Sequence, residues 1–545
     1  MPKYRDQLLT NATVRTFNQT DQTHEAIFIS NQRIRAVGSI DDLQNALPNR
    51  SDTEIIDLAG RTLIPGLVDA HVHMASTAWN HWDVDCRDTY DPTLTSNGAI
   101  ARKLKEESRT IVPGRWIIGM GSPLQESRLK EGRLPDRHQL DRACPDHPAF
   151  ILFGAYALSA NTRALCESGL WREAGKWPHH LLEREPETGY PNGIVRKAAG
   201  QALRRLISSP TEAEAEQNLR EYMYQAASRG ITTVHDFLSE PKELVLYQRL
   251  AHKGRLPIRV QLIIKIHDSG FPADLFLRGK GPPDLQHPDL FVAAAKISVD
   301  GGFTGGEAAF YENEGEAHLR LCPDELNRLV AAHHQKGVRL ALHAFGDRAA
   351  DLVLAAFDAV ESKWRLKTLQ HRVEHMGNWC FDADRRRAAK RLHVMPVPNP
   401  ALMYFLGDYA RQSLTPRQNQ AAFNLGSMRR DGLSIAGGSD AFSYWPADVL
   451  RDLYPVVWRK SEAGTVMGGE EALSIKGALR AQTVGAAALG KRAQRSGQLQ
   501  TGFDADLTLL SHDPFDNHHL DPRSIEVEGT MVGGKWVTDP PYRLN

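Results

Sequence analysis

The sequence predicts an α/β protein built on a closed (β/α)8 TIM barrel, and three observations lead to this fold class. Apolar runs typical of strands alternate with helical segments over residues 63–73 and 230–440. Eight strand-like runs occur there, the number that closes a barrel of parallel strands. Short alternating strand runs also occur at both ends of the chain, outside the barrel region.

Each of the predicted barrel strands is a short apolar run bounded by polar or glycine-containing residues. The eight strands cover residues 63–73, 231–237, 258–266, 291–300, 338–346, 372–375, 392–398 and 433–440. Helices are predicted at 243–254, 323–337 and 349–363. The second of these begins with Pro323 and Asp324 and closes at Gly337, as helix termini commonly do.

The two chain ends are predicted to build one small β-sandwich together. Strand runs at 8–17, 25–30, 33–38 and 54–64 precede the barrel, and further runs at 497–511 and 526–538 follow it. We therefore expect residues 1–64 and 491–545 to form the sandwich and residues 65–490 to form the barrel. Residues 84–220, with helical stretches and polar loops, would be an insertion after the first barrel strand.

Composition excludes several classes of protein. Lys plus Arg and Asp plus Glu both number 66, so the formal net charge is zero, which argues against a nucleic-acid or anionic-membrane binder. No apolar run is long enough to span a bilayer, and the first residues lack the apolar segment of a secretory signal. The five cysteines are scattered and form no CxxC pair. We expect reduced thiols and a cytoplasmic location.

Histidine is abundant, and His71 and His73 form the most informative pair. They stand at the end of the first predicted strand, where residues two apart face the same side. Both imidazoles can then point into the barrel mouth and hold one metal ion. Taken alone, the pair is equally compatible with two unrelated surface histidines.

Four further residues end or lie within later barrel strands: His343, His375, Asp440 and Lys296. Taken singly, each histidine is compatible with a structural role, and Asp440 is compatible with a helix cap. Lys296 lies among apolar residues, so its ammonium must be paired, neutral or modified. Together with His71 and His73 they fall at the carboxyl ends of strands one, four, five, six and eight, the catalytic face of such barrels. The mixture suits Zn²⁺ or a similar divalent ion. A carboxylated Lys296 would bridge two ions, whereas an unmodified lysine would indicate one ion or none at that position.

Other residues near these positions have weaker signals. Glu374 precedes His375 on a strand and should face the opposite way, so we expect a structural salt bridge there. Asp300 and the pair His235 and Asp236 end strands and are candidates for the barrel mouth. Aromatic residues that follow the ligand positions either wall a substrate site or serve only packing: Trp82, Phe303, Tyr444 and Trp445.

Several segments resemble the amidohydrolase superfamily in the same order along the chain. They are PGLVDAHVH (65–73), AAAKISVDGG (293–302), LALHAFGDRA (340–349), HRVEH (371–375) and GGSD (437–440). The chain is most similar to the amidohydrolase 3 or YtcJ-like branch, which includes N-substituted formamide deformylase. The resemblance extends over essentially the whole chain and implies a metal-dependent hydrolase of C–N or related bonds. It also implies a homodimer.

The resemblance assigns roles to the candidate ligands. His71 and His73 would bind a first metal, carboxylated Lys296 would bridge to a second, and His343 and His375 would bind that second ion. Asp440 would be a ligand and the general base.

The chain departs from the family pattern at positions expected near the substrate or second metal. Tyr156 stands where the family often has histidine, and Lys197 where it often has glutamate. We include both among the candidate substrate-binding residues, together with Trp82, Phe303 and Tyr444. Lys197 and Arg196 are candidates to meet a substrate carboxylate.

The expected reaction is hydrolysis of an amide, formamide or urea-like bond of a small molecule. A divalent ion would acidify a bound water, and Asp440 would accept its proton and return it to the leaving nitrogen. Lactone or ester hydrolysis and deamination on the same scaffold remain alternatives, although Lys296 argues against the deaminases. An inactive ligand- or partner-binding protein is the alternative of another class.

Overall fold

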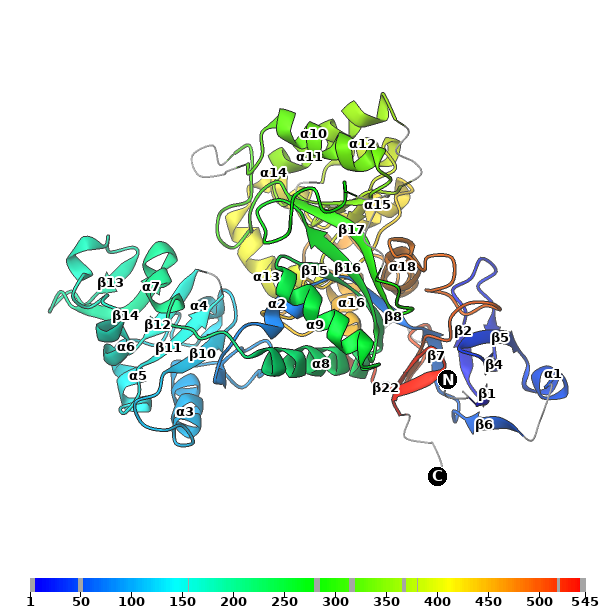
Figure 1. The fold of residues 1–545 in the computed structure, drawn as a ribbon, viewed down its shortest axis with the longest axis horizontal. Helices are drawn as coiled ribbons and strands as arrows, with labels where there is room; N and C mark the ends of the chain where they lie inside the picture. Colours follow the sequence, from blue (N-terminus) through cyan, green and yellow to red (C-terminus); the bar gives the residue numbers. More distant parts are fainter. Residues whose placement is uncertain are drawn as a thin grey trace. The chain divides into compact units, whose positions relative to one another are not determined.

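The computed structural model describes residues 5–47, 52–154, 156–278, 285–312, 319–364, 369–379, 381–516 and 520–539. Figure 1 shows the order of the elements along the chain. The chain divides into two compact units. The first contains residues 1–76, 216–441 and 447–545, and the second contains residues 77–215 and 442–446.

The first unit contains a seven-stranded sheet in which every neighbouring pair is parallel. The strands pair in chain order. Each connection therefore leads from one strand to its parallel neighbour, as the predicted barrel requires. The strands are β8 (Leu67–Val72), β15 (Ile231–Leu238), β16 (Arg259–Lys265), β17 (Leu290–Ser298), β18 (Leu340–His343), β19 (Arg372–Glu374) and β20 (Met395–Val397).

The eighth predicted strand, residues 433–440, is not a regular strand, yet it joins the two edges of this sheet. At the β20 edge, Ala436 N donates to Pro396 O and Gly438 N donates to Pro398 O. On the other side Ala70 N donates to Gly437 O, and Asp440 N donates to His71 O at 2.8 Å. The backbone of 433–440 therefore closes the barrel, and the predicted fold class is confirmed.

The glycines of this segment let its backbone pass close to neighbouring groups. A Cβ on Gly438 would lie 2.5 Å from His71 Cβ, and one on Gly437 would lie 2.5 Å from the side-chain amide of Gln482. At Gly438, only a residue without a side chain allows the backbone to pass so close to β8. Asp440 then adopts a left-handed conformation with φ of 59°, which ends the extended run.

Helices of the first unit follow the barrel strands or connect them to the chain ends. α9 and α10 begin with proline in the first turn and stop before Gly254 and Gly337, which have positive φ. The helices are α2 (Met74–Ala78), α8 (Glu212–Ser228), α9 (Pro241–His252), α10 (Pro323–Gln335), α11 (Asp347–Glu361), α12 (Ala383–Arg391), α13 (Pro400–Ser413), α14 (Pro416–Gln420), α15 (Leu425–Arg430), α16 (Val449–Trp458), α17 (Ile475–Arg480) and α18 (Ala486–Ala488). α2 crosses into the second unit, and α8 begins there.

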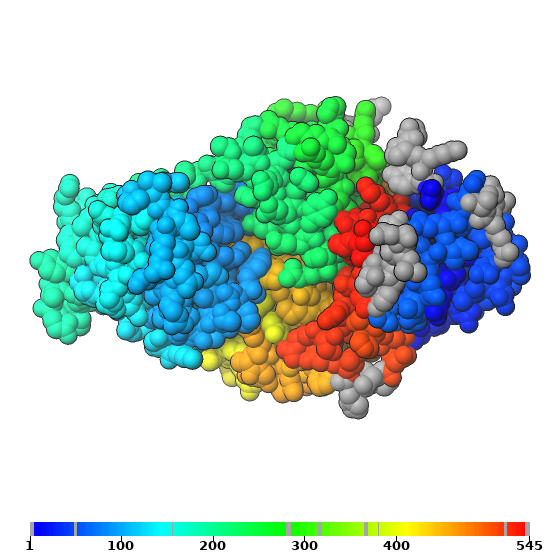
Figure 2. All heavy atoms as spheres, turned by 90° about the horizontal axis from the view of Figure 1, so that it is seen from below, coloured from blue at the N-terminus to red at the C-terminus, as the bar shows by residue number. Residues whose placement is uncertain are grey.

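Strands from both chain ends share one sheet in the first unit. In that sheet β21 pairs antiparallel with β7, and Leu509 lies opposite Leu63. In Figure 2 the red C-terminal residues accordingly lie against the blue N-terminal ones. The sheet contains β23 (Lys535–Thr538), β22 (Val527–Val532), β21 (Leu507–Leu510), β7 (Thr62–Pro65), β2 (Thr13–Arg15) and β3 (Thr23–His24).

A second sheet of N-terminal strands packs on this one. Ile27 and Ile56 of the N-terminal sheet belong to the same buried cluster as Leu63, Leu507 and Met531 of the mixed sheet. The two sheets thus enclose an apolar layer, as in a sandwich. The N-terminal sheet contains β5 (Arg33–Gly38), β4 (Ala26–Ser30), β1 (Asp6–Thr10) and β6 (Thr53–Asp57), and α1 (Ile40–Asn45) packs against it.

The second unit is a mixed six-stranded sheet with an apolar cluster on each face. Its strands, in spatial order, are β13 (Leu182–Arg184), β14 (Pro191–Arg196), β12 (Ala157–Ala160), β11 (Ala149–Phe153), β10 (Ile117–Gly121) and β9 (Val84–Asp85). Its helices are α3 (Asn97–Ser108), α4 (Gln125–Arg128), α5 (Arg137–Ala143), α6 (Thr162–Glu167) and α7 (Gln201–Arg204). Within the described ranges of both units, no helix is both long and apolar enough to cross a bilayer.

Candidate metal centre

Three side chains converge at the carboxyl end of β8. His71 Nε2 lies 3.4 Å from His73 Nε2, and Asp440 Oδ1 lies 3.4 Å and 3.3 Å from these two nitrogens. One ligand atom from each residue lies within 4.8 Å of the others. Two imidazoles and a carboxylate facing one point fit a divalent ion such as Zn²⁺. The period-two spacing of His71 and His73 therefore brings the rings together as expected.

Asp69 binds the two backbone segments that carry these ligands. It is fully buried, and its Oδ1 accepts from His71 N at 3.1 Å and from Ser439 N at 2.9 Å. Burial raises the pKa of Asp69 to about 6. The side chain links β8 to residues 433–440 next to Asp440, a role that no sequence motif indicates.

The other three predicted ligands, together with His73 and Asp440, line a cavity with a volume of about 300 Å³. Lys296 and His343 come from neighbouring strands β17 and β18, and His375 follows β19. The His343 and His375 ring centroids lie 4.5 Å apart, and those of His71 and His375 lie 4.9 Å apart. The barrel thus brings all six predicted ligands to one place.

Burial sets the protonation of these groups. It lowers the pKa of His71 and of His343 well below the ordinary value and that of His375 to about 4, so the three imidazoles are neutral, as metal ligation requires. Burial also lowers the pKa of Lys296 to about 8. Burial raises the pKa of Asp440, but the nearby histidines lower it more, and the net shift is downward.

Glu374 faces the barrel interior, so the predicted outward orientation is wrong. Its Oε2 lies 2.7 Å from His71 Nδ1, and its carboxylate also pairs with Arg372, which confirms the expected salt bridge. The strand ends at Glu374, and His375 has a φ of 68°, so the alternation of side chains stops between them. Both residues can then point inward.

The Glu374 carboxylate determines the tautomer of His71. A carboxylate next to Nδ1 holds the ring proton there and leaves Nε2 free to bind a metal. His375 has an equivalent partner, because its Nδ1 lies 2.7 Å from Asn399 Oδ1, which also accepts from Asn378 Nδ2. No sequence motif points to Asn399, although it follows the seventh predicted strand directly.

His235 and Asp236 support the centre rather than line its cavity. Arg372 Nη1 donates to His235 Nδ1 at 2.9 Å. Asp236 accepts from Met74 N and Ala75 N in the first turn of α2, at 2.8 Å and 2.9 Å. These bonds place the helix that follows His73.

Asp300 lines the cavity, as expected for the barrel mouth, but its oxygens are occupied. They accept from Ala309 N, Phe345 N and Gly346 N at 2.9 to 3.0 Å. Asp300 therefore ties the loop after β17 to the loop after β18.

The predicted substrate-binding residues are divided between the units. Phe303, in the first unit, is buried and stacks on Trp379 with ring centroids 4.7 Å apart. The other four lie in the second unit: Trp82, Tyr156, Lys197 and Tyr444. There, Lys197 N donates to Tyr156 O at 2.9 Å, and Arg196 pairs with Glu126 and Glu183. Their contact with substrate stays a prediction.

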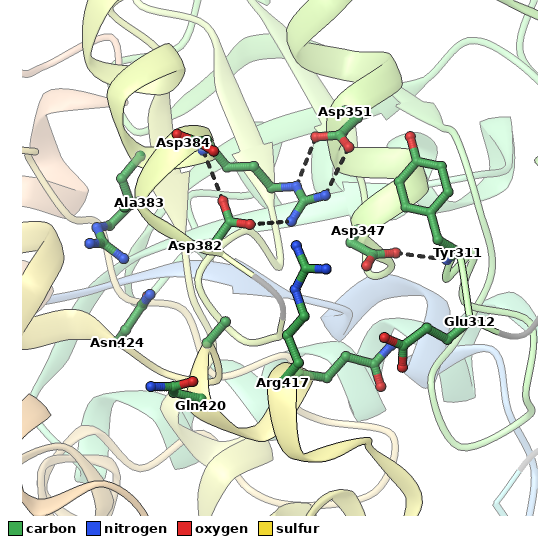
Figure 3. A pocket seen from close by; sticks show the side chains of 14 residues that line it. Tyr311, Glu312, Asp347, Asp351, Asp382, Ala383, Asp384, Arg417, Gln420 and Asn424 are labelled. Atoms are coloured by element: carbon green, nitrogen blue, oxygen red, sulfur yellow. Dashed lines mark hydrogen bonds and ion pairs between the residues drawn. The ribbon is translucent and has the colours of Figure 1, made fainter.

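A larger cavity of about 670 Å³ lies between α11, α12 and α14 and contains none of the candidate ligands. In Figure 3, dashed lines connect Asp351 and Asp382 of this cavity to an arginine side chain. Arg385 bonds both oxygens of Asp351 and also Asp382. Within the described part of the chain, the side chains that could hold a metal ion are His71, His73 and Asp440, so the candidate centre lies in the barrel mouth.

Comparison with known proteins agrees with this geometry. The amidohydrolase family matches residues 54–538. The chain belongs to the amidohydrolase family. This confirms the resemblance of the sequence motifs, and membership makes the protein a hydrolase whose family implies a divalent metal.

Two relatives resemble this amidohydrolase over nearly its whole length. N-substituted formamide deformylase of Arthrobacter pascens is 27% identical and covers 98% of this chain and of its own. YtcJ of Bacillus subtilis (strain 168) is 26% identical over 94% of this chain and 96% of its own. An uncharacterized metal-dependent hydrolase from Pyrococcus horikoshii has the same fold, with a TM-score of 0.72 at 21% identity over 95% of this chain and 99% of its own.

Proposed function

We propose that this amidohydrolase hydrolyses a C–N bond of a small amide, formamide or urea-like molecule. The observation that carries the proposal is the convergence of His71, His73 and Asp440 within 4.8 Å at the carboxyl ends of the barrel strands, where His73 and Asp440 line a cavity. The name of the Arthrobacter relative, a formamide deformylase, supports a C–N bond as the target.

The donor set fits one or two divalent ions. His71, His73 and Asp440 would hold the first, and His343 and His375 the second, with carboxylated Lys296 between them. A bound ion lowers the pKa of water from about 15.7 to about 7 and polarises a carbonyl oxygen. The neutral imidazoles described above are already in the ligating form.

Asp440 would move the proton in this reaction. Its pKa lies below the ordinary range, so the carboxylate is ionised and can accept a proton from the attacking water. It would then donate that proton to the leaving nitrogen. Phe237 and Phe345, which line the cavity, would exclude bulk water from the reacting groups.

Zinc as the ion, carboxylation of Lys296, a homodimer and a cytoplasmic location belong to this proposal as predictions. We infer a small-molecule substrate from the cavity volume of about 300 Å³, the lower end of the range for ligand sites.

Elemental analysis of metal per chain tests the proposal first, on protein purified with bicarbonate and without chelator. We expect about two zinc-like ions per chain and amine release from a panel of formamides, amides and ureas. Hydrolysis of lactones in a second panel would indicate an esterase, and release of ammonia would indicate deamination. Absence of bound metal, with no activity after metal is added, would contradict the proposal and favour a binding protein.

A further inference from the structure

We propose that the substrate carries a carboxylate and that Lys265 and Arg320 bind it at the rim of the metal cavity. This inference rests on the proposed function and adds a substrate class to it: small N-acyl compounds, such as N-formyl amino acids, whose amine portion ends in an acid. Neither residue was singled out by the sequence motifs.

Lys265 enters the cavity from the third barrel strand. It is the last residue of β16, and it lies in register with Lys296 of β17. Paired residues on neighbouring strands face the same side of a sheet, and both lysines line the cavity. Only 15% of the Lys265 side chain is exposed. The Lys265 side chain is thus mostly enclosed where it meets the cavity.

Arg320 reaches the same cavity from a loop. Its backbone N donates to Val299 O at 2.8 Å, which anchors it beside the end of β17. The side chain also lines the cavity. Lys265 and Arg320 therefore present an ammonium and a guanidinium to one space from two separate segments.

The carboxylates nearest these cations bind them weakly. Asp268 Oδ2 lies 3.5 Å from Lys265 Nζ and 3.6 Å from Arg320 Nη1, and Glu307 Oε2 lies 3.6 Å from Arg320 Nη2. Both acids are strongly exposed, 67% for Asp268 and 49% for Glu307, and neither lines the cavity. Long pairs between exposed groups contribute little.

The acids that do line the cavity have other partners. Asp300 accepts three backbone N–H groups, and Asp440 faces His71 and His73. The hydrogen bonds and short contacts of both acids are thus made with groups other than Lys265 and Arg320. A guanidinium binds a carboxylate with two parallel hydrogen bonds, so a substrate acid is the matching ligand. Phe237, Leu238 and Phe345 supply an apolar surface of the cavity that can contact the short carbon chain of the substrate.

The test compares matched substrates on the metal-loaded protein: N-formylglycine and N-formyl-β-alanine against the neutral N-formylglycinamide. Amine release gives kcat/KM for each. We expect the carboxylates to be preferred about tenfold or more, because bonds between charged groups are the stronger ones. The variants Arg320→Gln and Lys265→Met should bring the ratio of carboxylate to neutral substrate towards one. Arg278→Gln, at a 63% exposed arginine outside the cavity, is the control and should keep the wild-type ratio.

Binding supplies a readout that does not depend on turnover. Calorimetric titration of chelator-treated protein should show tighter binding of N-acetylglycine than of N-acetylglycinamide, and Arg320→Gln should remove the difference. Hydrolysis of the neutral formamide at an equal or higher rate than the acids would overturn this inference and leave the proposed function intact. An equal fall in kcat/KM for the carboxylate and the neutral substrates in Lys265→Met and Arg320→Gln would also overturn it. If no formamide is cleaved but the binding preference holds, the proposed function fails and the carboxylate site stands.

Discussion

The Glu374 carboxylate lies 2.7 Å from His71 Nδ1, and both side chains are fully buried. This contact connects the first and sixth barrel strands beneath the candidate metal centre. Arg372 pairs with the same carboxylate and donates to Ala70 O at 2.6 Å, so the strand carrying His71 is held by two bonds from β19. His71 can therefore present Nε2 to a metal in only one orientation.

Replacing Glu374 by Gln should weaken metal binding by about 10- to 100-fold, because the ring proton of His71 is then no longer held on Nδ1 by a charge. Metal retained during dialysis against graded chelator, normalised to folded protein, measures the effect. Glu106→Gln, at an exposed position of α3, is the control. Unchanged affinity in Glu374→Gln would remove this residue from the support of the centre.

Asp440→Asn should reduce turnover at least about 100-fold, the contribution typical of a general acid–base group. Metal content should fall less than in His71→Ala, because an amide oxygen can still occupy the ligand position whereas alanine cannot. Parallel kinetics and elemental analysis of the two variants check this. Near-normal turnover in the Asn variant would show that another group moves the proton.

Gly438→Ala should destabilise the barrel by about 1–3 kcal/mol, the range for overpacking a tight interior. The added Cβ would meet His71 Cβ at 2.5 Å, so His71 must shift and metal affinity should fall as well. Thermal unfolding with and without chelator measures both effects. Gly469→Ala is the control, since a Cβ there meets nothing within 4 Å. Equal behaviour of the two variants would contradict the close approach.

Stability at mildly acidic pH should depend on His371, which lies outside the metal cavity. Leu340 N donates to His371 Nδ1 at 3.0 Å, and His371 Nε2 lies 3.0 Å from His334 Nδ1, so the ring is neutral in the folded protein. Burial lowers its pKa from 6.5 to about 3. Unfolded chains take up a proton below pH 6.5 that the folded protein excludes, so stability falls as the pH decreases from 6.5 towards 3.

His371→Gln should reduce this loss, which for one group is about 2 kcal/mol between pH 6.5 and 5. Unfolding midpoints of the wild type and the variant across that interval give the comparison. His252→Gln, at an exposed histidine of α9, should retain the wild-type pH dependence. A variant that loses stability on acidification as steeply as the wild type would exclude His371 as the cause.

Much of the barrel and of the site follows from local patterns in the sequence. The alternation of apolar strands and helices predicts the parallel sheet, because each pattern reflects which faces an element buries. The spacing of His71 and His73 predicts a shared direction, because neighbouring residues of a strand face opposite sides. Glycine and proline at helix ends predict where α9 and α10 stop.

The orientation of Glu374 depended on a single backbone angle that no local pattern reveals. The φ of His375 is positive, and such a conformation for a non-glycine residue is stabilised by its surroundings, here the bond from His375 Nδ1 to Asn399. The close passage of Gly438 beside His71 likewise depends on contact between distant parts of the chain.

Residue types and strand periodicity thus determined the fold class and the six candidate ligands. Only the closed barrel decided which groups surround them: Asp69, Glu374 and Asn399 behind the ligands, and Lys265 and Arg320 at the rim. These contacts join residues far apart in the chain. Their geometry depends on strand register and on loop paths, which are set by packing of the whole barrel rather than by neighbouring residues.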